Sequence, residues 1–119
     1  MNNQPTQVAQ QWINAFNEHN LEALLFLYDD HAIHFSPKLK QRRPETEGLI
    51  KGKEAMLDWW RDALDRLPTL HYKLVRLTAN NDRVFMEYIR QVHDEEDMDV
   101  AEVLEIKDGK IIASRVYHG

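Results

Sequence analysis

The sequence contains no cysteine, and this absence removes a large group of functions. Without a thiol the chain forms no disulfide, carries no thiolate nucleophile and builds no zinc–thiolate site. No apolar run approaches the roughly 20 residues that a membrane-spanning helix needs. The segment from Met1 to Thr6 also lacks the apolar core of a signal peptide. These absences predict a cytoplasmic protein that has no membrane partner.

Positive charge is also scarce, with 15 Lys and Arg residues against 20 Asp and Glu residues and a formal net charge of −5. Proteins that bind nucleic acid usually present a basic face, so the sequence argues against that partner. It has no His-Glu-x-x-His motif, no carboxylate-rich loop and no glycine-rich phosphate loop, and therefore predicts no metal and no cofactor. The 119 residues are expected to form one domain, 1–119, that is large enough to enclose a pocket.

The second half of the chain reads as consecutive β-strands. Residues 70–79 and 83–93 are predicted to form the first two strands. Two further strands lie on either side of Asp108-Gly109, within the segment from Asp99 to His118. Asp-Gly between alternating apolar runs is a strong hairpin signal, because Gly adopts positive φ at little cost. Long antiparallel strands in succession form a sheet that another layer must cover.

Alternation along the strands assigns side chains to two faces. The outer face gains apolar content from Phe85, Ile89, Val103 and Tyr117. Polar groups on a covered face must be hydrogen-bonded, so polar residues there are the first functional candidates. The covered face is predicted to carry Val84, Met86, Tyr88, Arg90, Val92, Val100, Glu102, Leu104 and Ile106.

The register of the last strand allows two solutions. A two-residue turn places Glu102 opposite Arg115 and puts Tyr117 on the same face. A three-residue loop with a bulge at Gly109 shifts the register by one residue and turns Ser114, Val116 and His118 inward instead.

The first half of the chain contains three helical patterns. Residues 5–17 and 53–67 each have one apolar face, whereas residues 21–28 are apolar nearly all round and are expected to be buried. Residues 32–36 form a short strand. Residues 38–51 show no period and are interpreted as a surface loop, either over a pocket mouth or without a role.

Helices that come first and strands that come last predict an α+β fold. We expect three N-terminal helices packed on a strongly curved, mixed or antiparallel sheet. Such a sheet forms a cone, and three helices do not fill its concavity, so an internal pocket lined mostly by apolar residues is expected.

Segments along nearly the whole chain resemble the SnoaL-like group of the nuclear-transport-factor-2-like cone fold, whose relatives include ketosteroid isomerase, limonene epoxide hydrolase and polyketide cyclases. The similarity is specific for fold rather than chemistry, because this fold hosts enzymes and non-enzymes. It is carried by residues 12–17, 20–24, 28–32, 50–55, 107–111 and 115–118.

The resemblance to ketosteroid isomerase implies positions for three catalytic roles. The general-base aspartate matches Ser36, the helical tyrosine matches Trp12, and the protonated aspartic acid matches Glu102. Only Glu102 keeps the chemistry of its counterpart, so the match argues against steroid-type isomerisation by that mechanism.

Other relatives imply further constraints. An acidic position of limonene epoxide hydrolase falls at Val116, which argues against epoxide hydrolysis. In these relatives the positions that match Ser114, Val116 and His118 point into the pocket, which favours the bulged register. Relatives usually pair sheet to sheet, so the resemblance implies a homodimer through the outer sheet face.

Together these arguments predict one polar site in an apolar cone. Burial raises the pKa of a carboxylate such as Glu102, and a nearby imidazole can exchange a proton with it. Tyr88 or Arg90 would stabilise an oxyanion, although Arg90 and Glu102 could instead form a cross-strand ion pair. The predicted catalytic residues are Glu102, His34, His118, Tyr88 and Arg90, and the predicted substrate-binding residues are Trp12, Tyr28, Ser36, Met56, Trp59, Trp60, Leu104, Ser114 and Val116.

This chemistry suits a cofactor-independent isomerase, cyclase or lyase that abstracts a proton beside a carbonyl of a small hydrophobic ligand, or catalyses an aldol-type cyclisation. The alternative is a non-catalytic ligand-binding or dimerisation module of the same fold.

Overall fold

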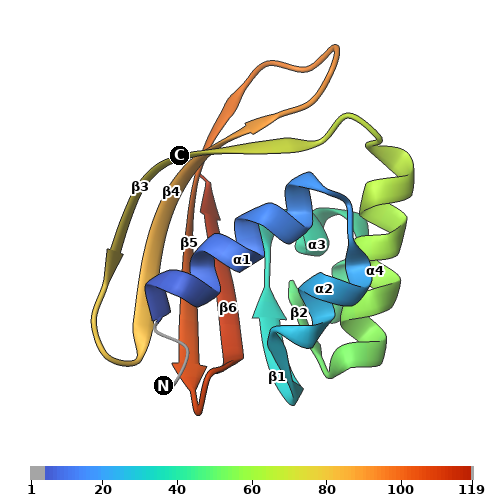
Figure 1. Ribbon diagram of the computed structural model, residues 1–119. Helices are drawn as coiled ribbons and strands as arrows, with labels where there is room; N and C mark the ends of the chain where they lie inside the picture. Colours follow the sequence, from blue (N-terminus) through green and yellow to red (C-terminus); the bar gives the residue numbers. More distant parts are fainter. Residues whose placement is uncertain (1–4, 119) are drawn as a thin grey trace.

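The computed structural model describes residues 5–118, in which helices and strands follow one another around a single sheet (Figure 1). The helices are α1 (Pro5–Asn17), α2 (Leu21–Phe26), α3 (Pro37–Arg42) and α4 (Lys53–Arg66), with a 3-10 turn at Pro44–Thr46. The strands are β1 (Tyr28–Phe35), β2 (Leu49–Lys51), β3 (His71–Ala79), β4 (Arg83–Gln91), β5 (Met98–Lys107) and β6 (Lys110–His118).

The six strands form one mixed sheet in the order β2-β1-β6-β5-β4-β3. All neighbours are antiparallel except β1 and β6, which run parallel. The sheet curves strongly, α1 crosses its concave side, and α4 stands beyond β1 and β2 (Figure 1). The predicted α+β class is confirmed, with four α-helices in the described residues where the sequence suggested three.

The predicted pairing of the two central strands is confirmed. Met86 lies opposite Glu102, and Tyr88 lies opposite Val100. Val84, Met86 and Leu104 are fully buried, as their position on the covered face requires. The alternation of side chains thus places Tyr88, Arg90 and Glu102 on the concave face together with the apolar core.

The hairpin between β5 and β6 combines features of both predicted registers. The turn has two residues, Asp108 and Gly109, and both have positive φ, as a type I′ turn requires. A bulge then follows at Ile112, where the register shifts between Glu105 and Ile106. The bulge therefore lies three residues beyond the predicted Gly109, yet it turns Ser114 and Val116 inward as the bulged alternative required.

Residues 38–51, interpreted as a surface loop, instead contain most of α3, a 3-10 turn and β2. The Ser36 side chain accepts a hydrogen bond from the Lys38 backbone N–H at 3.2 Å, and Pro37 occupies the first helical position. A serine cap followed by proline is a helix-start signal. The short helix buries Leu39 against the core, which gives this segment a fixed place beside the sheet.

The second predicted helix is shorter and more exposed than expected. It ends at Phe26, because Tyr28 pairs with Ile111 and begins β1. Leu24 is its one buried residue, and the Phe26 side chain is 68% exposed beneath the Lys110 ammonium group. The prediction of a wholly buried helix was therefore wrong, because a two-turn helix at the surface buries only one stripe.

Helix α1 is fixed to the edge strand β3 by a pair of hydrogen bonds. The Asn17 amide accepts from the Tyr72 N–H at 2.8 Å and donates to the Tyr72 carbonyl at 2.9 Å. These bonds satisfy backbone groups of an edge strand and hold Trp12 and Phe16 over the concave face.

Among residues 5–118 no helix combines the length and apolar character that a membrane crossing requires. The cytoplasmic location stays a prediction.

Candidate functional site

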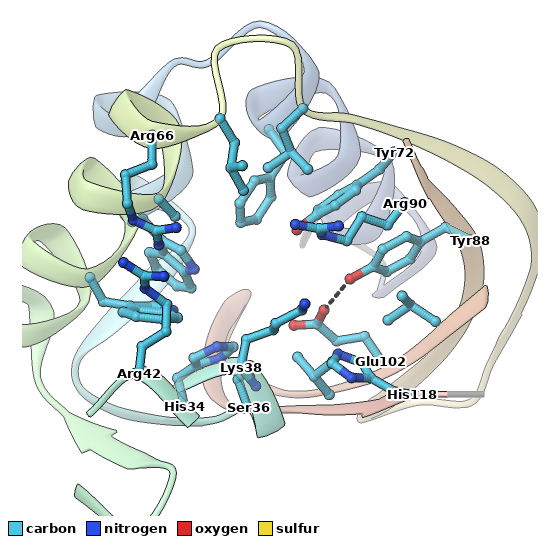
Figure 2. Close-up of a pocket in the computed structure, with 18 of the residues that line it drawn as sticks. His34, Ser36, Lys38, Arg42, Arg66, Tyr72, Tyr88, Arg90, Glu102 and His118 are labelled. Carbon is cyan, nitrogen blue, oxygen red and sulfur yellow. Dashed lines mark hydrogen bonds between the residues drawn. The ribbon is translucent and has the colours of Figure 1, made fainter. Parts of the chain in front are cut away.

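A cavity of about 230 Å³ opens between the concave side of the sheet and helices α1, α3 and α4 (Figure 2). All five residues predicted to be catalytic line it. Its apolar and aromatic wall includes Trp12, Phe16, Trp59, Trp60, Leu67, Leu70, Tyr72, Val100 and Val116.

Four of the predicted substrate-binding residues do not line the cavity. Tyr28, Met56 and Leu104 are fully buried, and Ser114 is 3% exposed, but all four lie behind the wall. Ser36 does line the cavity, where its hydroxyl caps α3. These four side chains therefore form a second layer of packed residues behind the side chains that line the cavity.

Glu102 is the buried carboxyl group of the cavity, with 1% of its surface exposed. The Tyr88 hydroxyl donates a hydrogen bond to Oε1 at 2.8 Å, whereas Oε2 has no hydrogen-bond partner among the described residues. Burial raises the pKa of Glu102 to about 8, and the Tyr88 hydrogen bond opposes this shift. Near neutral pH the group is thus mostly protonated and close to its titration point.

His34 lies on β1 directly opposite Ser114 of β6. Its Nδ1 lies 2.6 Å from the Ser114 hydroxyl oxygen, and its ring packs against Trp60 with centroids 5.1 Å apart. Burial lowers the pKa of His34 to about 3, so the imidazole is neutral at physiological pH.

A chain of hydrogen bonds leads to this imidazole. The Trp12 indole N–H donates to the Tyr28 hydroxyl at 3.1 Å, and that hydroxyl donates to Ser114 at 3.0 Å. The Ser114 hydroxyl lies within hydrogen-bond distance of Nδ1 of His34 and can donate its own proton to that nitrogen. In that arrangement the ring proton of His34 lies on Nε2, the nitrogen that the chain leaves free.

Arg90 of β4 and His118 of β6 also line the cavity. Arg90 donates to Glu95 of the β4–β5 loop at 2.8 Å rather than to Glu102, so the alternative of an Arg90–Glu102 ion pair is wrong. The β4–β5 loop folds back and brings the Glu95 carboxylate to Arg90. The alternation of side chains along the strands could not predict this contact, because Glu95 lies outside them. His118 is exposed, and burial of part of its ring together with the positive charges of Lys38 and Arg90 lowers its pKa.

The sequence interpretation missed several lining residues. Lys38 and Arg42 come from α3, Arg66 from α4 and Tyr72 from β3. Lys38 and Arg42 are four residues apart and so share one face of a helix. The Ser36-Pro37 start signal was the observation that could have revealed this face.

Two groups in the cavity have complementary properties. Glu102 has a carboxyl oxygen without a partner and a pKa near the physiological range, and His34 offers a neutral N–H donor. Such a pair can move a proton and stabilise a developing negative charge. Within residues 5–118 no three His, Asp or Glu side chains are grouped to hold a metal ion.

Comparison with known proteins identifies relatives of the whole fold. The sequence pattern of the SnoaL-like domain matches residues 9–114. A search of curated proteins finds no match. A SnoaL-like protein of unknown function from Burkholderia thailandensis superposes with a TM-score of 0.86 at 28% identity, covering 97% of this chain and 94% of that chain.

Two further solved structures share the fold at lower identity. A predicted polyketide cyclase from Sinorhizobium meliloti has a TM-score of 0.78 at 15% identity, covering 92% of this chain and 93% of that one. A predicted ketosteroid isomerase from Kribbella flavida has a TM-score of 0.77 at 17% identity, covering 94% and 75%. At these identities the likeness concerns the fold and not the chemistry.

Proposed function

The chain belongs to the SnoaL-like domain family, and we propose that it binds a small hydrophobic molecule in the cavity and acts on it by cofactor-free acid–base chemistry. The substrate class that fits is a carbonyl compound with an acidic C–H bond beside the carbonyl group. The reaction is an isomerisation, or a cyclisation of the aldol type.

One observation carries this proposal, namely the partnerless Oε2 of the buried Glu102 carboxyl group in the lining of the cavity. A buried polar atom without a partner costs stability, and such sites are commonly functional. A general base works best when its pKa lies near the working pH, and burial brings Glu102 to about 8.

In the proposed reaction the ionised Glu102 removes a proton from the carbon beside the carbonyl. The electron pair of that C–H bond moves toward the carbonyl oxygen, and the His34 Nε2–H stabilises the resulting enolate. Return of the proton to another carbon completes an isomerisation. Alternatively, the enolate carbon attacks a second carbonyl and closes a ring, and the alkoxide that forms takes up the proton from Glu102.

The other polar residues take supporting roles in this proposal. Tyr88 orients Glu102 through its hydrogen bond. Because the pKa of His34 is lowered to about 3, this imidazole is a poor base and acts as a hydrogen-bond donor instead. His118 and Arg90 also line the cavity, where they contact the substrate without moving its proton.

Hydrogen–deuterium exchange tests this function without knowledge of the product. In D₂O the protein is expected to accelerate deuterium incorporation at the carbon beside the carbonyl of small aryl and alkyl ketones. The measurement is mass spectrometry or proton NMR of the recovered ketone over time. Heat-denatured protein serves as the control, and equal exchange with native and denatured protein across the ketone series would contradict the proposal.

A second proposal concerns the outer face of the sheet, which we infer pairs with the same face of another copy in a homodimer. Phe85 and Tyr117 are 43% and 48% exposed there. Phe85 lies opposite the half-buried Val103, and Tyr117 lies opposite Ala101, so apolar side chains adjoin across three strands. Contiguous exposed apolar side chains of this kind favour an interface. The proposal holds equally for a non-catalytic module of this fold.

Phe85→Glu is expected to convert the dimer into a monomer, because it places a charge within the apolar face. The measurement is molar mass by light scattering at micromolar concentration. Phe26→Glu is a matched control, because Phe26 is exposed on α2 and its replacement leaves the sheet face unchanged. A wild-type protein that is already monomeric, or a Phe85→Glu variant that stays dimeric, would argue against this interface.

A further inference from the structure

The mouth of the cavity carries positive charge that the proposed acid–base chemistry does not use. We infer that the ligand is a small carboxylic acid, with its carboxylate bound by Lys38 and Arg42 at the mouth and its apolar body inside the cavity. This inference rests on the proposed function only in taking the same cavity as the ligand site.

Four cationic side chains line the cavity, namely Lys38, Arg42, Arg66 and Arg90. Figure 2 shows the amino group of Lys38 and the guanidinium of Arg90 directed toward the open centre, with Arg42 and Arg66 facing one another across from Arg90. The four cations come from three elements, α3, α4 and β4, so their convergence is a property of the tertiary structure.

Two of these cations already have a carboxylate partner. Arg66 contacts Asp62 at 2.9 Å, and Arg90 contacts Glu95 at 2.8 Å. No carboxylate of residues 5–118 lies within salt-bridge distance of Lys38 or Arg42. Glu102, the other acidic residue of the lining, is mostly uncharged near neutral pH. Lys38 and Arg42 thus form no ion pair with a described side chain, although their charges help to lower the pKa values of Glu95 and Asp62.

This local charge is opposite in sign to that of the whole chain, which is −5. A cleft lined by one sign of charge attracts ligands of the other sign. A neutral hydrophobic ligand would gain nothing from these charges, whereas a carboxylate would form charge-assisted hydrogen bonds with both side chains.

The interior limits the size of the apolar body. A cavity of about 150 Å³ can hold one benzene molecule, so the volume of about 230 Å³ accommodates one ring with a short side chain. Trp12, Trp59 and Trp60 supply aromatic surface for such a group. A ligand that spans the site therefore has an apolar ring within and an anionic end at Lys38 and Arg42.

Calorimetric binding of matched ligands tests this inference. The probes are the ω-phenylalkanoates from phenylacetate to 5-phenylpentanoate, each compared with its neutral amide in low-salt buffer at pH 7. At the best chain length the acid is expected to bind at least about tenfold more tightly than the amide, because only the acid forms charge-assisted bonds. Raising the salt concentration should reduce this ratio.

Variants assign the preference to particular residues. In the Lys38→Met/Arg42→Met double variant, the acid and the amide are expected to bind within about threefold of each other. Lys40→Met is the matched control, because Lys40 lies on the same short helix, is exposed and does not line the cavity. It should keep the preference for the acid.

The outcomes separate this inference from the proposed function. Equal binding of acid and amide by the wild-type protein overturns the carboxylate inference and leaves the acid–base proposal standing. A preference that Lys40→Met removes as completely as the double variant also overturns it, since the effect would then come from overall charge. Absence of binding by every acid and amide overturns both the inference and the assignment of the cavity as a ligand site.

Discussion

Glu102→Gln is expected to lower the rate of ketone deuterium exchange by at least about 100-fold while the protein stays folded, because general-base catalysis contributes factors of this size. Glutamine keeps the shape of the side chain and can still accept the Tyr88 hydrogen bond through its amide oxygen. It has no basic oxygen with which to remove a proton. The measurement is the initial exchange rate at pH 8, with circular dichroism as the check on folding.

Glu105→Gln is the matched control for this variant. Glu105 lies three residues further along β5 on the opposite face, where it is exposed to solvent. The same chemical change there should leave exchange unaltered. An unchanged rate in Glu102→Gln, or an equal loss in Glu105→Gln, would remove Glu102 from the mechanism.

The pH dependence of the exchange rate shows whether Glu102 acts as a general base or as a general acid. Because the pKa of Glu102 is raised to about 8, the fraction of ionised carboxylate rises about tenfold per pH unit below that value. The exchange rate of the wild-type protein should follow this rise and level off above pH 8. A rate that falls above pH 8 would instead assign Glu102 as the acid.

The free energy of unfolding is expected to fall by about 2 kcal/mol more in the wild-type protein than in Glu102→Gln as the pH rises from 6.5 to 8. The pKa of Glu102 is about 8 in the folded protein against an ordinary value of 4.5, so folding favours its protonated form. This stabilisation is complete below pH 4.5 and is lost as the pH rises through 8, the folded pKa. One pKa unit corresponds to about 1.4 kcal/mol, and the window spans 1.5 units.

His34 has the opposite effect at lower pH. Its pKa is lowered from 6.5 to about 3, so its contribution to stability is present above pH 6.5 and is lost as the pH falls toward 3. Between pH 4.5 and 6.5 the two residues therefore oppose each other. The window from pH 6.5 to 8 lies above the His34 titration and isolates Glu102.

Urea denaturation at intervals of half a pH unit measures this effect, and Glu105→Gln again provides the comparison. Subtracting the curve of Glu102→Gln removes the contributions of His34, His118 and the other titrating groups that the two proteins share. Parallel curves for the wild-type protein and Glu102→Gln between pH 6.5 and 8 would show that the Glu102 carboxyl is well solvated.

The two predictions describe one physical arrangement. A buried carboxyl group with one oxygen unpaired reduces stability as it ionises, and that ionised form is the base that the proposed reaction requires. Selection for activity can retain such a residue even though a neutral replacement would be more stable at alkaline pH.

Much of the architecture follows from local patterns in the sequence. Alternation along β4 and β5 assigned Tyr88, Arg90 and Glu102 to the covered face, and the structure places them there. The Asp108-Gly109 turn was also predicted from a local pattern, because a turn with positive φ at two adjacent residues favours this pair. The first helix was predicted with its observed bounds, Pro5–Asn17. These features depend on neighbours within a few residues, so a single sequence reports them.

Only the tertiary structure decided how these elements form a site. The bulge at Ile112 sets which β6 side chains face inward, and the parallel pairing of β1 with β6 brings His34 against Ser114. Because the β4–β5 loop folds back, Arg90 forms an ion pair with Glu95, and Glu102 has no charged partner. The sequence by itself determined the periodicity of the elements and the residues available on each face. Tertiary packing decided their partners, burial and charge, because these depend on contacts between segments that lie far apart along the chain.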